Sequence, residues 1–273
     1  MQSDDFRVDS HAHIFTTSLS LAPGHRHAPQ YDATLQNYLQ LLDAHNIAYG
    51  LLTAPSFLGT DNSHLLAGLA AAQGRLRGTV IVDPRTPRAT LETFAQQGVV
   101  GIRLNLFRKS DADLPDLRSP QYRVLFNSCA ELDWHVEIYG EGPRLAGWLP
   151  QIMASGVKVV VDHFGSPDPA AGVNCLGFRR ILSGFGSGRL WVKLSAPYRV
   201  GAALAEDCAQ QLLQEGGAQR LVWGSDWPWT QNETGRSYAQ CLRWLEEWVP
   251  DATARQTILG ATPRKLFHFP EST

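Results

Sequence analysis

Four polar side chains in this sequence stand at the ends of short apolar runs, and together they could do chemistry. The run RVDSHAH ends in His11 and His13, the run KVVVDH ends in His163, and the run LVWGSD ends in Asp226. Side chains alternate along a strand, so His11 and His13 are expected to point to the same face. Three imidazoles and a carboxylate that converge can form a metal site or a set of acid and base groups. Each residue alone has a structural explanation, but their shared position favours a single site.

The apolar runs that carry these residues predict buried parallel strands. Eight runs rich in Val, Ile and Leu lack a polar face, as strands buried on both sides should. They are residues 6–13, 48–53, 78–83, 99–105, 134–139, 158–163, 190–195 and 221–226. Segments with helical spacing lie between or after them, at 34–45, 61–73, 86–98, 119–132, 143–155, 201–215 and 235–248.

About eight strand–helix units are typical of one fold, the (β/α)8 TIM barrel. We therefore expect α/β architecture with a single domain over residues 1–273 and an active site at the C-terminal ends of the strands. The longest irregular stretches, 16–31, 107–118 and 166–176, all follow strands and should lie at that face.

The bulk composition limits the classes of partner. The chain has 273 residues, of which 44% are hydrophobic and 18% charged, and its formal net charge is -2. This balance predicts a globular protein with no basic face for nucleic acid or an anionic membrane. The four widely spaced cysteines predict free thiols in a reducing compartment. With no signal-peptide core and no stretch near the roughly 18–20 apolar residues of a membrane span, we expect a cytoplasmic monomer or homodimer.

Several of these segments resemble one known family. HAH in the first strand, VDHFG in the sixth and GSDWP in the eighth are similar to the amidohydrolase superfamily, in its amidohydrolase-related (amidohydrolase 2) branch. GIRLNL, WHVEIYGEG and WVKLSAPYR extend the match over essentially the whole chain. That branch contains metal-dependent decarboxylases and metal-independent lactonases. The pattern is most similar to the lactonases that act on 2-pyrone-4,6-dicarboxylate and to their relatives.

The end of the fifth strand distinguishes the two kinds of enzyme. The metal-dependent decarboxylases place a ligand histidine there, where this chain has Tyr139. A phenol with a pKa of about 10 is a poor ligand for a divalent ion at neutral pH. Lys193 could form a carbamate, but a buried lysine paired with a barrel carboxylate such as Glu137 is the favoured interpretation. We expect no obligatory cofactor, and any zinc or manganese would be held weakly by His11, His13 and Asp226.

The four polar residues can hydrolyse an activated ester without a metal. Asp226 can act as general base towards water if neighbouring histidines, partly protonated, keep its pKa low. His11, His13 and His163 can donate hydrogen bonds to a carbonyl oxygen as it gains charge. The resemblance to the lactonases implies these same roles, and the other histidines, including His27, are assigned no chemistry.

Two arginines predict an anionic substrate. Arg103 and Arg199 lie in or just after apolar strands, where an unpaired guanidinium is costly, so each has a carboxylate partner or awaits a ligand. The resemblance implies that both bind substrate carboxylates and that Tyr139 contacts the substrate. Three other positions depart from the dicarboxylate lactonases, and we include them as substrate-binding candidates. Ser166 stands where those enzymes have an arginine, and Trp229 stands where they have a histidine. Lys109 falls near the position of an arginine in their fourth-strand loop. The losses favour a small-molecule anionic lactone with one carboxylate.

Three alternatives remain open. A metal-dependent decarboxylase or amidohydrolase of the same fold would need tightly bound metal. A sugar-acid lactone isomerase would move the ring between hydroxyls without releasing acid. A barrel that binds ligand but has lost catalysis would show no turnover.

Overall fold

The computed structural model describes residues 6–270 as a (β/α)8 barrel, which confirms the predicted fold class. Residues 1–5, part of the segment expected to lack a signal peptide, and residues 271–273 lie outside the described range. Each strand pairs in parallel with the next along the chain. The strands are β1 (Val8–Ala12), β2 (Tyr49–Thr53), β3 (Leu76–Val80), β4 (Val99–Asn105), β5 (His135–Tyr139), β6 (Lys158–Val161), β7 (Leu190–Leu194) and β8 (Leu221–Trp223).

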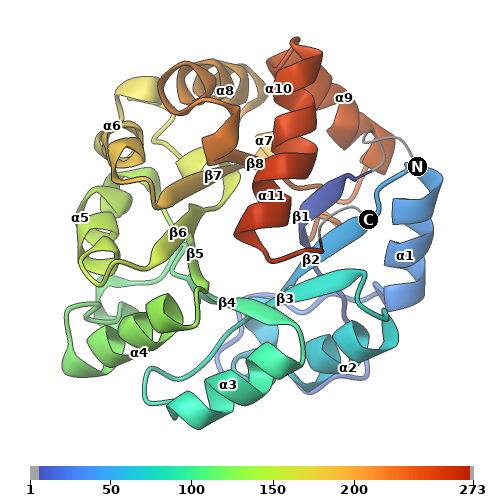
Figure 1. Cartoon of the computed structure of the whole chain (residues 1–273), viewed down its shortest axis with the longest axis vertical. Coiled ribbons are helices and arrows are strands. Elements are labelled where there is room, and N and C mark those ends of the chain that lie inside the picture. Colours follow the sequence, from blue (N-terminus) through green and yellow to red (C-terminus); the bar gives the residue numbers. More distant parts are fainter. Residues whose placement is uncertain (1–5, 271–273) are drawn as a thin grey trace.

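The helices surround the strands, as the view down the barrel shows (Figure 1). They are α1 (Leu35–Ala44), α2 (Ser63–Ala71), α3 (Arg88–Gln96), α4 (Pro120–Glu131), α5 (Gly142–Met153), α6 (Leu176–Gly184), α7 (Pro197–Val200), α8 (Ala202–Gly216), α9 (Tyr238–Trp248), α10 (Ala252–Gln256) and α11 (Thr262–Leu266). A π-helical turn, Thr257–Ala261, joins the last two. None of the helices in this described range is long and apolar enough to cross a membrane.

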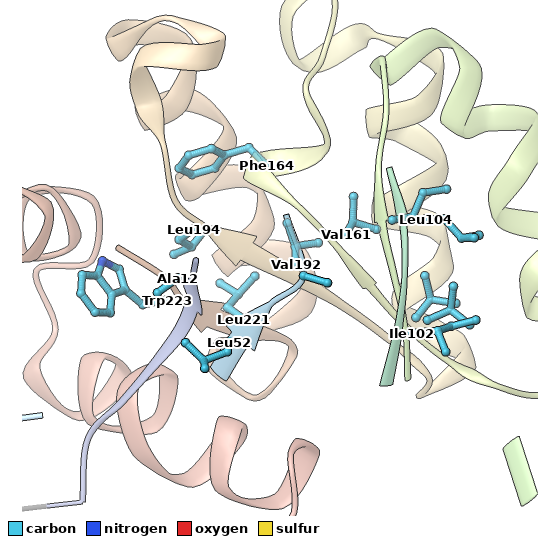
Figure 2. Packing of buried hydrophobic residues seen from close by; sticks show 14 of the residues in the cluster. Ala12, Leu52, Ile102, Leu104, Val161, Phe164, Val192, Leu194, Leu221 and Trp223 are labelled. Carbon is cyan, nitrogen blue, oxygen red and sulfur yellow. The ribbon is translucent and has the colours of Figure 1, made fainter. Parts of the chain in front are cut away.

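The side chains of the strands separate into two cores because successive residues point to opposite faces. Outward residues pack against the helices, and Figure 2 shows Leu52, Val161 and Leu194 of this layer on three different strands. Inward residues at the N-terminal end of the barrel form a smaller cluster that Phe267 and Phe269 cover from the end of the chain. The C-terminal half of the barrel interior is left for polar side chains.

The observed elements differ from the predicted ones at several strand ends, and four observed helices, α6, α7, α10 and α11, were not predicted. β3 begins at Leu76, two residues before the predicted run, and β6 and β8 end before His163 and Asp226. These two residues therefore stand on short turns beyond their strands. Helix α6 was not predicted, because its sequence LGFRRILSG is short and carries glycines that disfavour helix.

Candidate active site

The polar half of the barrel interior holds a compact group of charges. Lys193 on β7 places its Nζ 2.5 Å from Oε2 of Glu137 and 3.3 Å from Oδ1 of Asp162. Arg103, paired with Glu137 across β4 and β5, lies 3.3 Å from Glu137 and 3.5 Å from Asp162. The structure thus pairs Lys193 with Glu137, as the sequence suggested. The two cations and two carboxylates are buried and balance one another.

Burial and opposite charges act differently on the two carboxylates. Burial, together with the charge of Asp162, raises the pKa of Glu137 to about 7. Burial also opposes ionisation of Asp162, but the charge of Lys193 together with the interactions of His11 and His163 outweighs it and holds the pKa of Asp162 well below its ordinary value. Asp162 is the firmly ionised partner of the cations.

The two histidines of β1 lie directly above this charge cluster. His11 is fully buried, with Nδ1 2.9 Å from Nζ of Lys193 and Nε2 3.3 Å from Nε2 of His13. Nδ1 of His13 lies 2.6 Å from the carbonyl oxygen of Thr53, which can only accept a hydrogen bond. Burial lowers the pKa of His13 to about 3 and that of His11 well below its ordinary value, so both rings are neutral at neutral pH.

Asp226 is held by a tyrosine and an arginine from the short helix α7. Its Oδ2 accepts hydrogen bonds from the Tyr198 hydroxyl at 2.7 Å and from Nε of Arg199 at 2.9 Å. Burial opposes ionisation, but the charges of Arg199, His163, His11 and His13 together outweigh it and hold the pKa of Asp226 below its ordinary range. Histidines are expected in this role from the sequence, and Arg199 contributes more than any one of them. Burial lowers the pKa of His163 to about 4 and leaves its ring neutral at neutral pH, where the charge of Arg199 remains.

The second oxygen of Asp226 is available for chemistry. Oδ1 lies 3.5 Å from Nε2 of His11 and 3.8 Å from Nε2 of His163, and no residue in the described range donates a hydrogen bond to it. The other ring nitrogen of His163 lies 2.8 Å from the Ser195 hydroxyl, which can donate to it. With that hydrogen bond, His163 carries its proton on Nε2, on the side of Asp226.

The segment after β8 is attached to β1, which closes the barrel and fixes Asp226. The backbone N–H of Asp226 donates to the carbonyl of His11 at 2.9 Å. Asp9 of β1 accepts from the backbone N–H of Ser225 at 2.8 Å, from the Ser225 hydroxyl at 2.6 Å and from the Tyr238 hydroxyl at 2.9 Å. Asp9 was not among the predicted site residues, although it lies in the RVDSHAH run and an aspartate inside a buried strand calls for a partner.

A cavity of about 440 Å³ opens above Asp226 at the C-terminal end of the barrel. Six of the predicted site residues line it: His13, Arg103, Tyr139, His163, Arg199 and Asp226. His11 lies beneath them, fully buried. The sequence left open whether Arg103 and Arg199 have a carboxylate partner or await a ligand. In the structure, each arginine is paired with a carboxylate and also lines the cavity.

The three positions that depart from the lactonase pattern lie outside the cavity wall. Lys109 is exposed, and its carbonyl accepts a hydrogen bond from Arg144. Ser166 lies in the turn after His163, where its carbonyl accepts from the backbone N–H of Gly142. Trp229 is half-buried, and its indole N–H donates to the carbonyl of Ser225.

Loop residues complete the cavity wall. Arg26 and His27 from the loop after β1, Arg108 from the loop after β4, and Tyr198 line the cavity and were not predicted. Arg26 donates to the carbonyl of Phe107, and Arg108 lies over the Phe107 ring. The only sequence signal for them was that long irregular stretches follow the first and fourth strands.

Comparison with known proteins identifies the family. The family model described as Amidohydrolase matches residues 8–269. The chain belongs to this amidohydrolase family. It is 26% identical to a 4-sulfomuconolactone hydrolase of Rhizobium radiobacter over 268 residues, 95% of this chain and 89% of that protein. It is 25% identical to a 2-pyrone-4,6-dicarboxylate hydrolase of Comamonas testosteroni, over 95% of this chain and 89% of that protein.

A solved structure from Pseudomonas putida superposes on this amidohydrolase with a TM-score of 0.90. It carries a provisional 2-pyrone-4,6-dicarboxylic acid hydrolase name and is 40% identical, covering 98% of this chain and 99% of that chain. The similarity spans the whole barrel, including every strand end that bears a site residue.

The metal ligands that the family pattern suggests lie close enough together to hold one ion, but a histidine can bind a metal only through a ring nitrogen that carries no proton. Ligand atoms of His11, His13 and Asp226 lie within 4.8 Å of one another. A ligand histidine normally donates its other N–H to a carbonyl or carboxylate, as His13 does towards Thr53. His11 instead faces Nζ of Lys193 through Nδ1, and an ammonium there can only donate, which favours the His11 proton on Nε2. With the proton on that nitrogen, this donor set does not fit a divalent ion.

Proposed function

We propose that this amidohydrolase hydrolyses the ester bond of an anionic lactone, with Asp226 as the general base. The observation that carries the proposal is that the two oxygens of the Asp226 carboxylate have different surroundings. Oδ2 is occupied by Tyr198 and Arg199, while Oδ1 faces the imidazoles and the cavity with no hydrogen-bond donor. A carboxylate held ionised, with one free oxygen above a cavity, suits the abstraction of a proton from water.

The geometry supports distinct roles for the imidazoles. His163, with its proton on Nε2, can donate to the lactone carbonyl oxygen as negative charge develops there. His13 donates from Nδ1 to Thr53, which fixes the orientation of its ring in the cavity wall beside the lactone. His11 lies too deep to touch substrate and supports His13 from below.

In the proposed reaction, a water molecule lies between Asp226 and the lactone carbonyl carbon. Its proton passes to Oδ1 of Asp226 as its oxygen bonds to that carbon, giving a tetrahedral oxyanion facing His163. Collapse breaks the ring C–O bond, and the proton on Asp226 passes to the leaving oxygen. The new carboxyl group then releases the second proton of the water to solvent. The products are a carboxylate and a hydroxyl (or its keto tautomer) on one open-chain acid together with that proton, and Asp226 is ionised again.

The charge distribution supports an anionic substrate. The buried cations Arg103, Lys193 and Arg199 are matched by three carboxylates, those of Glu137, Asp162 and Asp226. At the cavity rim, Arg26 and Arg108 form no ion pair with any carboxylate in the described range. The rim therefore provides the positive charge that would attract and bind an anionic group.

The test is acid release by chelator-treated protein against carboxylated lactones, including 2-pyrone-4,6-dicarboxylate and several sugar-acid lactones. Asp226→Asn should lower kcat about 10²–10⁴-fold with an unchanged circular dichroism spectrum. Asp207→Asn, an exposed position on α8, is the matched control and should turn over normally. An isomerised product without acid, turnover only with added zinc or manganese, or near wild-type kcat in Asp226→Asn would each refute the proposal.

A further inference from the structure

The hydrogen bonds along the floor of the site run in one direction. Thr53 offers only a carbonyl oxygen to His13, so Nδ1 of His13 must donate and its Nε2 has no proton. Nε2 of His11 lies 3.3 Å from that unprotonated nitrogen, and the contact is favourable only if His11 donates. This reasoning starts from Thr53 and places the proton of His11 on Nε2.

A second constraint reaches the same result from the other end. Nζ of Lys193 lies 2.9 Å from Nδ1 of His11, and an ammonium can only donate. Two carboxylates, on Glu137 and Asp162, lie within 3.3 Å of Nζ and stabilise that ammonium. Oδ1 of Asp162 also lies 3.3 Å from Nδ1 of His11, but Nζ of Lys193 lies closer to that nitrogen, at 2.9 Å.

We propose that Lys193 is a positioning residue that fixes the tautomers of both β1 histidines. Its ammonium donates to Nδ1 of His11, Nε2 of His11 donates to Nε2 of His13, and Nδ1 of His13 donates to Thr53. These three hydrogen bonds hold the ring of His13 in one defined orientation towards the cavity. It also removes the lone pair of His11 Nε2 that a divalent metal would need.

Burial supports the same arrangement. Lys193 and His11 are fully buried, so water cannot substitute for either partner in the chain. Burial, followed by the charge of Lys193, lowers the pKa of His11, which favours a neutral ring with a single proton. A neutral ring must choose one nitrogen for that proton, and Lys193 makes the choice.

The first test uses the wild-type protein labelled with ¹⁵N-histidine. Long-range ¹H–¹⁵N correlation spectra distinguish protonated from unprotonated ring nitrogens, and His11→Asn assigns the His11 signals. We expect the proton on Nε2 in His11 and on Nδ1 in His13. A proton on Nδ1 of His11 would overturn the proposal.

The second test measures zinc binding by calorimetry in a charge-balanced variant. Lys193→Met combined with Glu137→Gln removes one cation and one anion, so the net charge equals that of wild type. We expect zinc to bind about 10–100-fold more tightly than to wild type and to the single Glu137→Gln control. Equal zinc affinity in all three proteins would overturn the proposal.

The inference rests on the proposed function only for the catalytic use of the His13 orientation. Neither the tautomer spectra nor zinc binding requires a substrate. Failure of lactone hydrolysis with the expected spectra would therefore refute the proposed function alone, and turnover with the opposite tautomer would refute the role of Lys193 alone.

Discussion

Replacing Asp9 by alanine should loosen the closure of the barrel and displace Asp226. Asp9 joins β1 to the segment after β8 and to α9, accepting from the Ser225 backbone, the Ser225 hydroxyl and the Tyr238 hydroxyl. β8 itself ends at Trp223, so the segment that carries Asp226 relies on these bonds and on the backbone bond from Asp226 to His11.

The structure sets the size of the expected loss. Alanine would leave four buried donors without their acceptor, because the backbone N–H of His11 also donates to Asp9, and each unsatisfied group costs about 1–2 kcal/mol. The free energy of unfolding should therefore fall by about 4–8 kcal/mol. At about 2–4 °C per kcal/mol for a domain of this size, the melting temperature should fall by roughly 10 °C or more.

Asp9→Asn separates hydrogen bonding from charge. The amide oxygen can still accept from the Ser225 backbone, and the hydroxyls of Ser225 and Tyr238 can rotate to accept from the amide N–H groups. Burial raises the pKa of Asp9, so the asparagine also removes a charge that burial disfavours. We expect asparagine to lose less than half of the stability that alanine loses.

Chemical and thermal unfolding followed by circular dichroism, with kcat on the same samples, provides the assay. At a temperature where Asp9→Ala is still folded, its kcat should also fall, because Ser225 precedes Asp226 in the chain. An unfolding free energy within 1 kcal/mol of wild type would refute the role of Asp9 in closure. Equal losses in the alanine and asparagine variants would show that the charge matters and not the hydrogen bonds.

Three further predictions follow from the site and the packing. Burial lowers the pKa of His163 to about 4, so kcat/KM should stay constant as pH falls from 7 to 5 and decrease only near pH 4, when the ring gains a proton; an inflection near 6.5 in the pH–rate profile would contradict this. Arg26→Gln should raise KM for an anionic lactone several-fold with little change in kcat and should weaken the salt dependence of kcat/KM; steady-state kinetics at two ionic strengths decides. Gly177→Ala should lower the melting temperature, because its Cβ would overlap the carbonyl oxygen of Gly142 and force α5 and α6 apart. Gly147→Ala in α5 is the control: its Cβ meets nothing within 4 Å, so it should be neutral or stabilising in the same thermal scan.

The strand pattern could be predicted because it depends on local chemistry. β4 begins and ends where its apolar run does, since a run rich in β-branched residues and without a polar face marks a strand buried on both faces. Helix α6 escaped prediction because its stability comes from packing: Gly177 allows the close approach to α5, and no residue pattern within the helix reports that contact.

The candidate site was predictable in its members and not in their pairing. In a parallel barrel all strands end at the same face, so His13, His163 and Asp226 could be placed near one another from their positions in the runs. Arg199 was expected to bind substrate, yet it holds Asp226 at 2.9 Å, a contact between residues 27 positions apart in the chain. Arg26 belongs to a loop, whose course over the cavity no periodic pattern describes.

The sequence by itself determined the barrel, the face that bears the chemistry and the residue types gathered there, because alternation and strand ends are properties of consecutive residues. Only the tertiary structure decided which oxygen of Asp226 is free and which groups face the two ring nitrogens of His11. Those outcomes depend on distances of about 3 Å between groups far apart in the chain, such as Lys193 and His11. Hydrogen bonds and ion pairs at that range are fixed only when the whole barrel closes.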